Sequence, residues 1–228
     1  MNPLEKTQVD GLRFFGMISA SISHEIKNVL AIISESAGLM EDYLLLAQKG
    51  GSLDMEKFQA VCAKVRRQTQ RADGIIKNMN RFSHSVDQDV KRLDLNELII
   101  LVRALIDRLA AMRGVSLEET RANEAVWVTT NPFLLTRQIW ACIDFAMSVA
   151  APEKRVQILV TDEPAHGCVA LRGLRHEDVA DRLAGLVASE ASQMNLLGAT
   201  LLAEADQGGI SLLIPKDLPH DGTGEKRR

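Results

Sequence analysis

The sequence has few aromatic residues and no long apolar run. Aromatic side chains make up 4% of its 228 residues, so we expect its cores to be mainly aliphatic. No apolar run approaches the ~18 residues that a membrane-spanning helix needs, and the N-terminus has neither a basic leader nor a long apolar core. These absences predict a cytoplasmic protein that makes no membrane contact.

The sequence also has few cysteines and little net charge. The three cysteines, Cys62, Cys142 and Cys168, are an odd number without ligand-like spacing, and each lies in an apolar stretch. We therefore expect buried, reduced thiols and no metal site. The formal net charge of −3 gives no reason to expect a nucleic-acid partner.

The first third of the sequence predicts two amphipathic helices joined by a short turn. The first runs from about residue 9 to 48 and ends at Gly50-Gly51, and the second follows Ser52, a possible N-cap, and runs to about residue 85. Apolar residues recur every three or four positions along both helices, which places them on one face. These residues are Ile18, Ile22, Ile26, Val29, Ile33, Ala37, Met40 and Leu44, followed by Phe58, Val61, Cys62, Val65, Ala72, Ile75, Ile76, Met79 and Phe82.

A hairpin of two such helices cannot cover both apolar stripes by itself. A second copy of the chain can cover them, which predicts a homodimer through residues 10–85 that forms a four-helix bundle. Basic residues also gather on the second helix and form either a solvated face or a surface for an acidic partner: Lys64, Arg66, Arg67 and Arg71.

Successive residues of a helix are rotated by roughly 100°, which places His24 almost opposite the centre of the first stripe. We therefore expect it to face solvent, with Asn28 one turn further on the same face and Glu25 on the flank. A solvent-facing imidazole keeps one ring nitrogen free to attack phosphorus, and an adjacent carboxylate can accept the proton from the other nitrogen. An exposed helix can also carry these three residue types without a function, and the surrounding sequence decides between the two interpretations.

The second half of the sequence alternates between strand and helix patterns. Asp94 starts a helix that stops at Gly114, and Asn131-Pro132 starts another that runs to about residue 150. A third helix is expected at about 177–195, with strands at 115–118, 125–129, 156–160, 168–171, 200–205 and 210–214. Helices that interleave with antiparallel hairpins indicate an α/β sandwich, with helices on one face of a mixed sheet.

The stretch Ser23-His24-Glu25-Ile26-Lys27-Asn28-Val29-Leu30 resembles the phosphoacceptor box of two-component sensor histidine kinases, S-H-E-[IL]-[KR]-[NT]-P-L. It matches at every position but one, where Val29 replaces proline. The resemblance implies that residues 1–90 are a dimerisation and histidine phosphotransfer hairpin, with His24 as phosphoacceptor, Glu25 as proton acceptor and Asn28 positioning a water or the phosphate. His84, near the end of the second helix, lacks the neighbouring Glu and Asn and is not expected to be a second phosphoacceptor.

Residues 91–218 resemble the ATP-binding domain of the same kinases, from Asp94-Leu95-Asn96-Glu97-Leu98 to the closing hairpin that ends Ile214-Pro215. The asparagines of the family's N-box are replaced by Ala141 and Phe145, which offer no oxygen ligand to a hard cation. Arg172-Gly173-Leu174-Arg175 replaces the Asp-x-Gly-x-Gly sequence that reads adenine, and no glycine-rich lid follows. The resemblance therefore implies a degenerate ATP-binding-like domain, with no bound cofactor or metal and Asp144 as a poor magnesium ligand by itself. The last residues, 219–228, read as a disordered tail.

These features predict a histidine phosphotransferase similar to the ChpT-like kind. It would move a phosphoryl group between receiver-domain aspartates through His24, with response-regulator receiver domains as partners and with magnesium supplied by the receiver. The alternatives are a response-regulator phosphatase, a divergent sensor kinase core that phosphorylates itself, and a non-catalytic pseudokinase scaffold.

Overall fold

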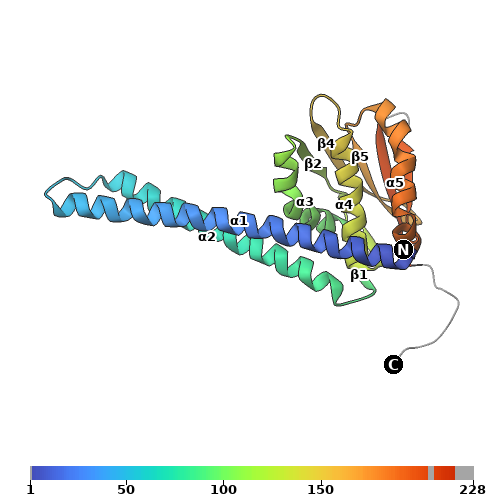
Figure 1. The fold of residues 1–228 in the computed structure, drawn as a ribbon, viewed down its shortest axis with the longest axis horizontal. Coiled ribbons are helices and arrows are strands. Elements are labelled where there is room, and N and C mark those ends of the chain that lie inside the picture. Colours follow the sequence, from blue (N-terminus) through green and yellow to red (C-terminus); the bar gives the residue numbers. More distant parts are fainter. Residues whose placement is uncertain (1, 205–207, 219–228) are drawn as a thin grey trace. The chain divides into compact units, whose positions relative to one another are not determined.

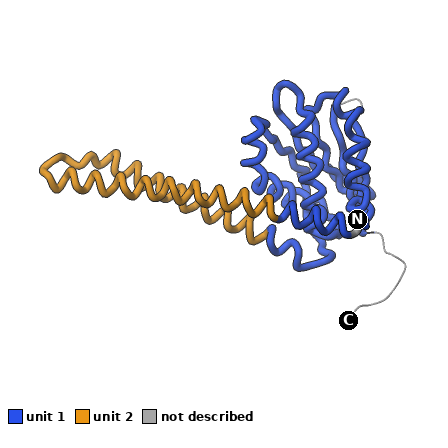
Figure 2. The backbone as a smooth tube through the Cα atoms, in the orientation of Figure 1, with its two compact units in different colours: residues 1–15, 82–228 blue, residues 16–81 orange. Residues whose placement is uncertain are grey.

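Two long helices form the N-terminal part of the computed structural model, which describes residues 2–204 and 208–218. Helix α1 spans Pro3–Gln48 and helix α2 spans Met55–Ser83 (Figure 1). The chain divides into two compact units: residues 16–81 form the helical hairpin, and residues 1–15 together with 82–228 form an α/β unit (Figure 2). The tail predicted at 219–228 lies outside the described residues.

The turn between the helices differs from the prediction in one detail. Gly50 takes a φ of 87°, the left-handed conformation expected for a residue that ends a helix. Helix α2 is capped by Asp54 and not by Ser52, because the Asp54 carboxylate accepts a hydrogen bond from the Lys57 backbone N–H at 3.1 Å. This backbone bond lowers the pKa of Asp54 below its ordinary value.

The apolar stripe predicted on α1 divides into two neighbouring faces. The first, called here the hairpin seam, is buried or half-buried and recurs at heptad spacing on both helices: Ile22, Glu25, Val29, Ile32 and Ser36 on α1, with Val61, Val65, Gln68, Ala72 and Ile75 on α2. The second, called the outer face, is Ile26, Leu30, Ile33, Ala37 and Leu44 on α1. Leu30 is 56% exposed and Leu44 is 48% exposed. One partner helix can cover only one seam, so the hairpin leaves the outer face uncovered.

The α/β unit contains seven strands and three longer helices among its described residues. The helices are α3 (Leu95–Met112), α4 (Pro132–Ser148) and α5 (His176–Leu197), and a short 3₁₀ turn, η1, spans His84–Val86. The strands are β1 (Lys91–Asp94), β2 (Ser116–Thr120), β3 (Trp127–Thr130), β4 (Arg155–Asp162), β5 (His166–Arg172), β6 (Thr200–Glu204) and β7 (Gly209–Pro215). Strand β1 was not predicted, and the other elements lie where the sequence patterns placed them, within a few residues.

The caps that start and end these helices follow the predicted residues. Asp94 accepts a hydrogen bond from the backbone N–H of Asn96 at 3.0 Å and starts α3. Asn131 accepts one from the N–H of Leu134 at 2.9 Å and starts α4, with Pro132 in its first turn. Gly114 and Gly198, with φ of 65° and 60°, follow the ends of α3 and α5.

The main sheet has five strands in the order β2-β4-β5-β7-β6. Strands β2 and β4 are parallel and the other neighbours are antiparallel, so the sheet is mixed as predicted. Helices α3, α4 and α5 pack on one face of this sheet (Figure 1). Aliphatic side chains fill the space between the two layers, among them Ile139, Ile158 and Ile210, which are almost fully buried.

The few aromatic residues concentrate in one cluster of the α/β unit, against the N-terminal end of α1. Phe14 packs edge-on against Phe82 with ring centroids 5.5 Å apart, and it also contacts Phe133 and Trp140 of α4. Phe82 is 1% exposed and stacks on Phe15. Phe14 of α1 is therefore part of the core of this unit.

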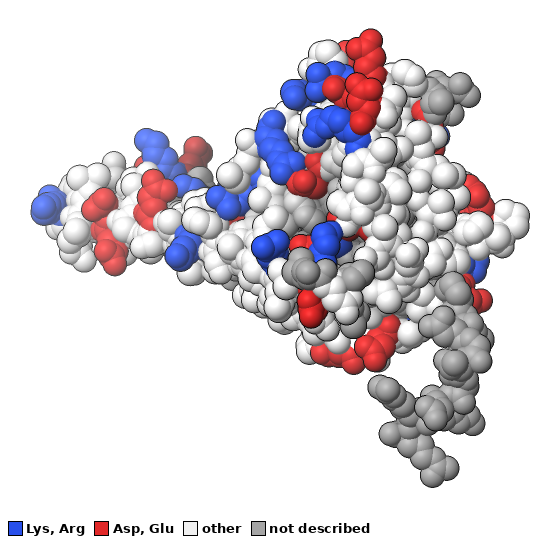
Figure 3. Space-filling view, turned by 45° about the vertical axis from the view of Figure 1, so that its right-hand side comes forward, with Lys and Arg blue, Asp and Glu red and all other residues white. Residues whose placement is uncertain are grey.

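The cysteines and surface charges agree with the composition. All three cysteines are free, with Cys142 and Cys168 buried and Cys62 only half-buried, because Cys62 lies on the edge of the hairpin seam. Burial raises the pKa of the Cys142 thiol to about 12, so the thiol stays protonated. Acidic and basic side chains are interspersed over the face of the molecule drawn in Figure 3. None of the described helices combines the length and apolar character that crossing a bilayer requires.

Candidate functional site

His24 lies on α1 outside the hairpin seam, and its side chain is exposed, as is that of Asn28 one turn further along. Val29, which stands where the resemblance predicts proline, is fully buried in the seam, and α1 continues through it without interruption. The backbone N–H of a valine can donate a hydrogen bond within the helix, whereas proline has no N–H to donate. The unbroken helix therefore follows from the sequence. The imidazole is therefore presented from a regular helix.

Glu25 occupies a seam position and is half-buried. Its carboxylate lies 3.6 Å from the guanidinium of Arg71 on α2, and no hydrogen bond joins it to His24 in the described part of the chain. Arg71 therefore competes with the imidazole for this carboxylate. The structure brings His24 and Asn28 onto one exposed face and directs Glu25 towards the opposite helix.

Basic residues of α2 lie on the same side of the hairpin as His24. In an antiparallel pair, the residues that immediately precede seam positions lie on one side of both helices. The polar and charged residues at these positions include His24, Asn28 and Glu35 on α1, and Lys64, Arg67 and Arg71 on α2. The ion pairs from Glu25 to Arg71 and from Glu35 to Lys64 connect the two helices along this side. An anionic phosphoryl group on His24 would therefore lie on the same side of the hairpin as three cations, of which Lys64 and Arg71 are already paired with carboxylates.

The positions that replace the N-box asparagines lie in α4. Ala141 is half-buried and Phe145 is buried, with 8% of its surface exposed. Asp144 forms an ion pair with Arg113 from the end of α3, at 2.7 Å. The sequence does not indicate this ion pair, because Arg113 lies 31 residues before Asp144. With an alanine, a phenylalanine and an occupied carboxylate, this surface of α4 does not fit magnesium and nucleotide phosphates.

The connection from β5 to α5 leaves no room for a lid. It consists of Gly173, Leu174 and Arg175, and backbone hydrogen bonds hold each of them. The carbonyl of Gly173 accepts from Ala151 at 2.9 Å, the N–H of Leu174 donates to Gly208 at 3.1 Å, and the N–H of Arg175 donates to Val149 at 2.9 Å. Gly173 takes a φ of 86°. The segment is thus fixed along its whole length, by two hydrogen bonds to residues just after α4 and one to a residue just before β7.

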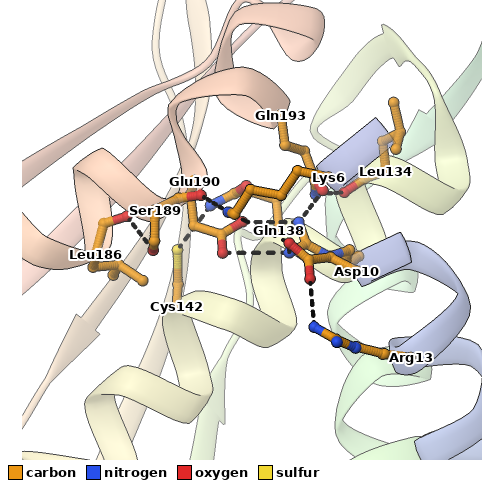
Figure 4. A network of polar contacts seen from close by, with 11 residues as sticks. Lys6, Asp10, Arg13, Leu134, Gln138, Cys142, Leu186, Ser189, Glu190 and Gln193 are labelled. Atoms are coloured by element: carbon orange, nitrogen blue, oxygen red, sulfur yellow. Dashed lines mark hydrogen bonds and ion pairs between the residues drawn. The ribbon is translucent and has the colours of Figure 1, made fainter. Parts of the chain in front are cut away.

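Helices α4 and α5 are joined by a buried polar network around Arg137 (Figure 4). The Arg137 guanidinium donates to the Glu190 carboxylate at 2.8 and 3.3 Å and to the Gln193 side-chain oxygen. Asp10 of α1 lies 3.6 Å from the same guanidinium, and Gln193 donates to the Leu134 carbonyl at 2.7 Å. The network holds α5 directly against α4. Sequence analysis did not predict it, because each of its contacts joins residues that are 53 or more positions apart.

Metal-binding clusters of three or more His, Cys, Asp or Glu side chains are absent from the residues that the structure describes. The candidate phosphoacceptor His24 is exposed and lies on the same side of the hairpin as basic residues of α2. The roles assigned to His24, Glu25 and Asn28 stay predictions.

The sequence matches no model of a known protein family and no curated protein. Comparison with solved structures finds histidine kinases and their parts. The catalytic domain of the histidine kinase ThkA is 18% identical with a TM-score of 0.46, over 57% of this chain and 99% of that domain. The Acinetobacter baumannii histidine kinase AdeS is 11% identical with a TM-score of 0.44, over 79% of this chain and 95% of the matched chain.

ThkA in complex with the response regulator protein TrrA is also similar. It is 16% identical with a TM-score of 0.44, over 90% of this chain and 63% of the matched chain. The chain is thus similar to histidine kinases, in a helical N-terminal region followed by an α/β domain.

Proposed function

We propose that this chain is a histidine phosphotransferase of a two-component phosphorelay. His24 takes a phosphoryl group from the aspartyl phosphate of one receiver domain and passes it to the aspartate of another, and no ATP is used. The observation that carries this proposal is that His24 is exposed within an otherwise intact phosphoacceptor box, whereas α4 and the β5–α5 connection lack a nucleotide site. The partners are receiver domains, which supply the magnesium.

The transfer needs little chemistry from the chain beyond positioning and charge. A ring nitrogen of His24 attacks phosphorus, the bond between phosphorus and the aspartyl oxygen breaks, and the aspartate leaves as a carboxylate. Arg67 and Arg71, on the same side of the hairpin, offset the charge of the phosphoryl oxygens. Arg71 is the ion-pair partner of Glu25 in this structure, so Glu25 accepts the proton of the other ring nitrogen once Arg71 turns towards the phosphoryl group.

The first test is transfer of labelled phosphate to the full chain from a phosphorylated receiver domain, beside an incubation with labelled ATP. We expect label on His24 from the receiver, none from ATP, and no label at this position in His24→Ala, with the labelled residue identified by mass spectrometry. His176→Ala removes another exposed histidine and should change nothing. Label from ATP would identify an autokinase, and absence of label from every receiver tried would contradict the phosphotransferase.

A second candidate function is dephosphorylation of a receiver, favoured by Asn28, which is exposed one turn from His24. An amide at this position can orient a water towards an aspartyl phosphate. The expected result for Asn28→Ala is that label still reaches His24, whereas the receiver loses phosphate about 100-fold more slowly than with the native chain. Unchanged loss of receiver phosphate in Asn28→Ala, measured as release of inorganic phosphate, would exclude this activity of Asn28.

A further inference from the structure

The 3₁₀ turn that follows α2 carries a second exposed histidine whose ring is already oriented. The Nδ1 atom of His84 lies 2.7 Å from the Oδ2 atom of Asp87, three residues further along the chain. Both side chains face solvent, with 76% of His84 and 57% of Asp87 exposed. The sequence did not indicate this pair, because the residue directly after His84 is a serine and the carboxylate comes from the end of the turn.

The hydrogen bond determines which ring nitrogen is available. An ionised carboxylate only accepts hydrogen bonds, so Nδ1 of His84 must carry the proton. In the neutral imidazole, Nε2 then holds the free lone pair, and it is the nitrogen more distant from Asp87. His176 is exposed as well, but no polar contact involves its ring in the described residues.

The backbone that carries His84 is fixed from both sides. Phe82 is fully buried in the aromatic cluster, and the buried Ser85 hydroxyl donates to the Phe82 carbonyl at 2.6 Å. The N–H of Asp87 donates to the His84 carbonyl at 3.3 Å, which closes the turn. His84 and Asp87 are thus exposed side chains on an anchored turn, so little conformational freedom is lost when a phosphoryl donor approaches.

We propose that His84 is a second phosphoacceptor of this chain, which takes a phosphoryl group at Nε2 from an activated donor. The Nε2 lone pair attacks phosphorus, an N–P bond forms, and the bond from phosphorus to the leaving group breaks with its electron pair. The proton stays on Nδ1, where the Asp87 carboxylate stabilises the positive charge that develops on the ring. That the donor in the cell is an acyl phosphate of a receiver domain rests on the proposed function; the reactivity of His84 does not.

The test uses the full chain with His24→Ala, so that no label can reach His84 through His24, and phosphoramidate as a small donor whose leaving group is ammonia. The site and rate of phosphorylation are followed by tandem mass spectrometry, and the isomer by ³¹P–¹⁵N NMR. We expect phosphorylation at Nε2 of His84 to be about tenfold faster than at His176, or more. In the same background Asp87→Asn should lower the His84 rate to that of His176, because an amide can donate to Nδ1 and favour the other tautomer.

Equal rates at His84 and His176 would overturn the proposal, as would a His84 rate that Asp87→Asn leaves unchanged. The two histidine rates are measured within one chain without a substitution in the turn, so both rates refer to the same folded state. The donor is a small molecule, so failure of receiver-to-His24 transfer in the earlier experiment has no bearing on this result.

Discussion

Gly173 shows how a single residue fixes the segment between β5 and α5. Its φ of 86° is one that other residues rarely adopt, and a Cβ atom there would lie 2.3 Å from the Arg155 carbonyl oxygen. We expect Gly173→Ala to lower the free energy of unfolding by about 2–4 kcal/mol, measured by urea denaturation.

The control for this substitution is Gly185→Ala in α5, where a Cβ would meet no heavy atom within 4 Å. Alanine is the better helix former, so this variant should gain about 0.5–1 kcal/mol in the free energy of unfolding. If both variants were equally stable, neither the φ of Gly173 nor the contact with Arg155 would matter.

At this scale the sequence predicted the exposure of individual residues better than their contacts. The exposed positions of His24 and Asn28, the left-handed Gly50 and the caps Asp94 and Asn131 all follow local rules, and all are confirmed. Asp54 displaced Ser52 as the cap of α2, because the helix begins two residues later than expected. The ion pair between Asp144 and Arg113 joins two helices and has no local signal.

The contact between α4 and α5 depends on the Arg137 network, in which two charged groups are almost fully buried. Arg137→Met removes the guanidinium and leaves the Glu190 carboxylate buried without a cation. Breaking a buried pair in this way costs about 3–5 kcal/mol, so we expect a loss of that size in urea denaturation.

The matched variant for the network is Arg137→Met combined with Glu190→Met. Removing both charges together takes away the desolvation cost as well as the attraction, so the double variant should regain most of the lost stability. Additive losses from the two substitutions would instead show that the groups do not act as a pair.

Local patterns predicted most helices and strands, and strand β1 shows why they did not predict all of them. Strand β1 consists of Lys-Arg-Leu-Asp, which has neither β-branched residues nor a clear alternation. It is extended because it pairs antiparallel with β3, where Arg92 lies opposite Thr129 and Lys91 opposite Thr130. Such a strand depends on a partner about 37 residues away and has little propensity by itself.

At the scale of the whole molecule, the uncovered outer face of the hairpin supports the proposed homodimer. The residues that follow seam positions lie on one side of both helices, so Cys62, Thr69 and Ile76 of α2 extend the outer face of α1. Ile76 is 48% exposed. A second hairpin packed on this side would complete a four-helix bundle and leave His24, on the opposite side, accessible.

Leu30→Asp tests this arrangement. It places a charge at the centre of the outer face in both copies, and we expect it to raise the Kd of the dimer at least about 100-fold. Sedimentation equilibrium over a range of chain concentrations measures the change. Leu45→Asp, at a 51% exposed leucine of α1 outside both faces, is the control and should leave the Kd unchanged. A native chain that is monomeric at ~100 μM would contradict the homodimer.

The short β5–α5 connection also has a consequence for how this domain can change over evolution. Asparagines at positions 141 and 145 can be introduced by substitution, but a loop able to fold over a nucleotide cannot. It needs an insertion at three residues whose backbone groups already bond to Val149, Ala151 and Gly208, two of them beyond the end of α4 and one before β7. Descendants of this chain can therefore diversify in the surfaces they present far more readily than they can acquire a nucleotide site.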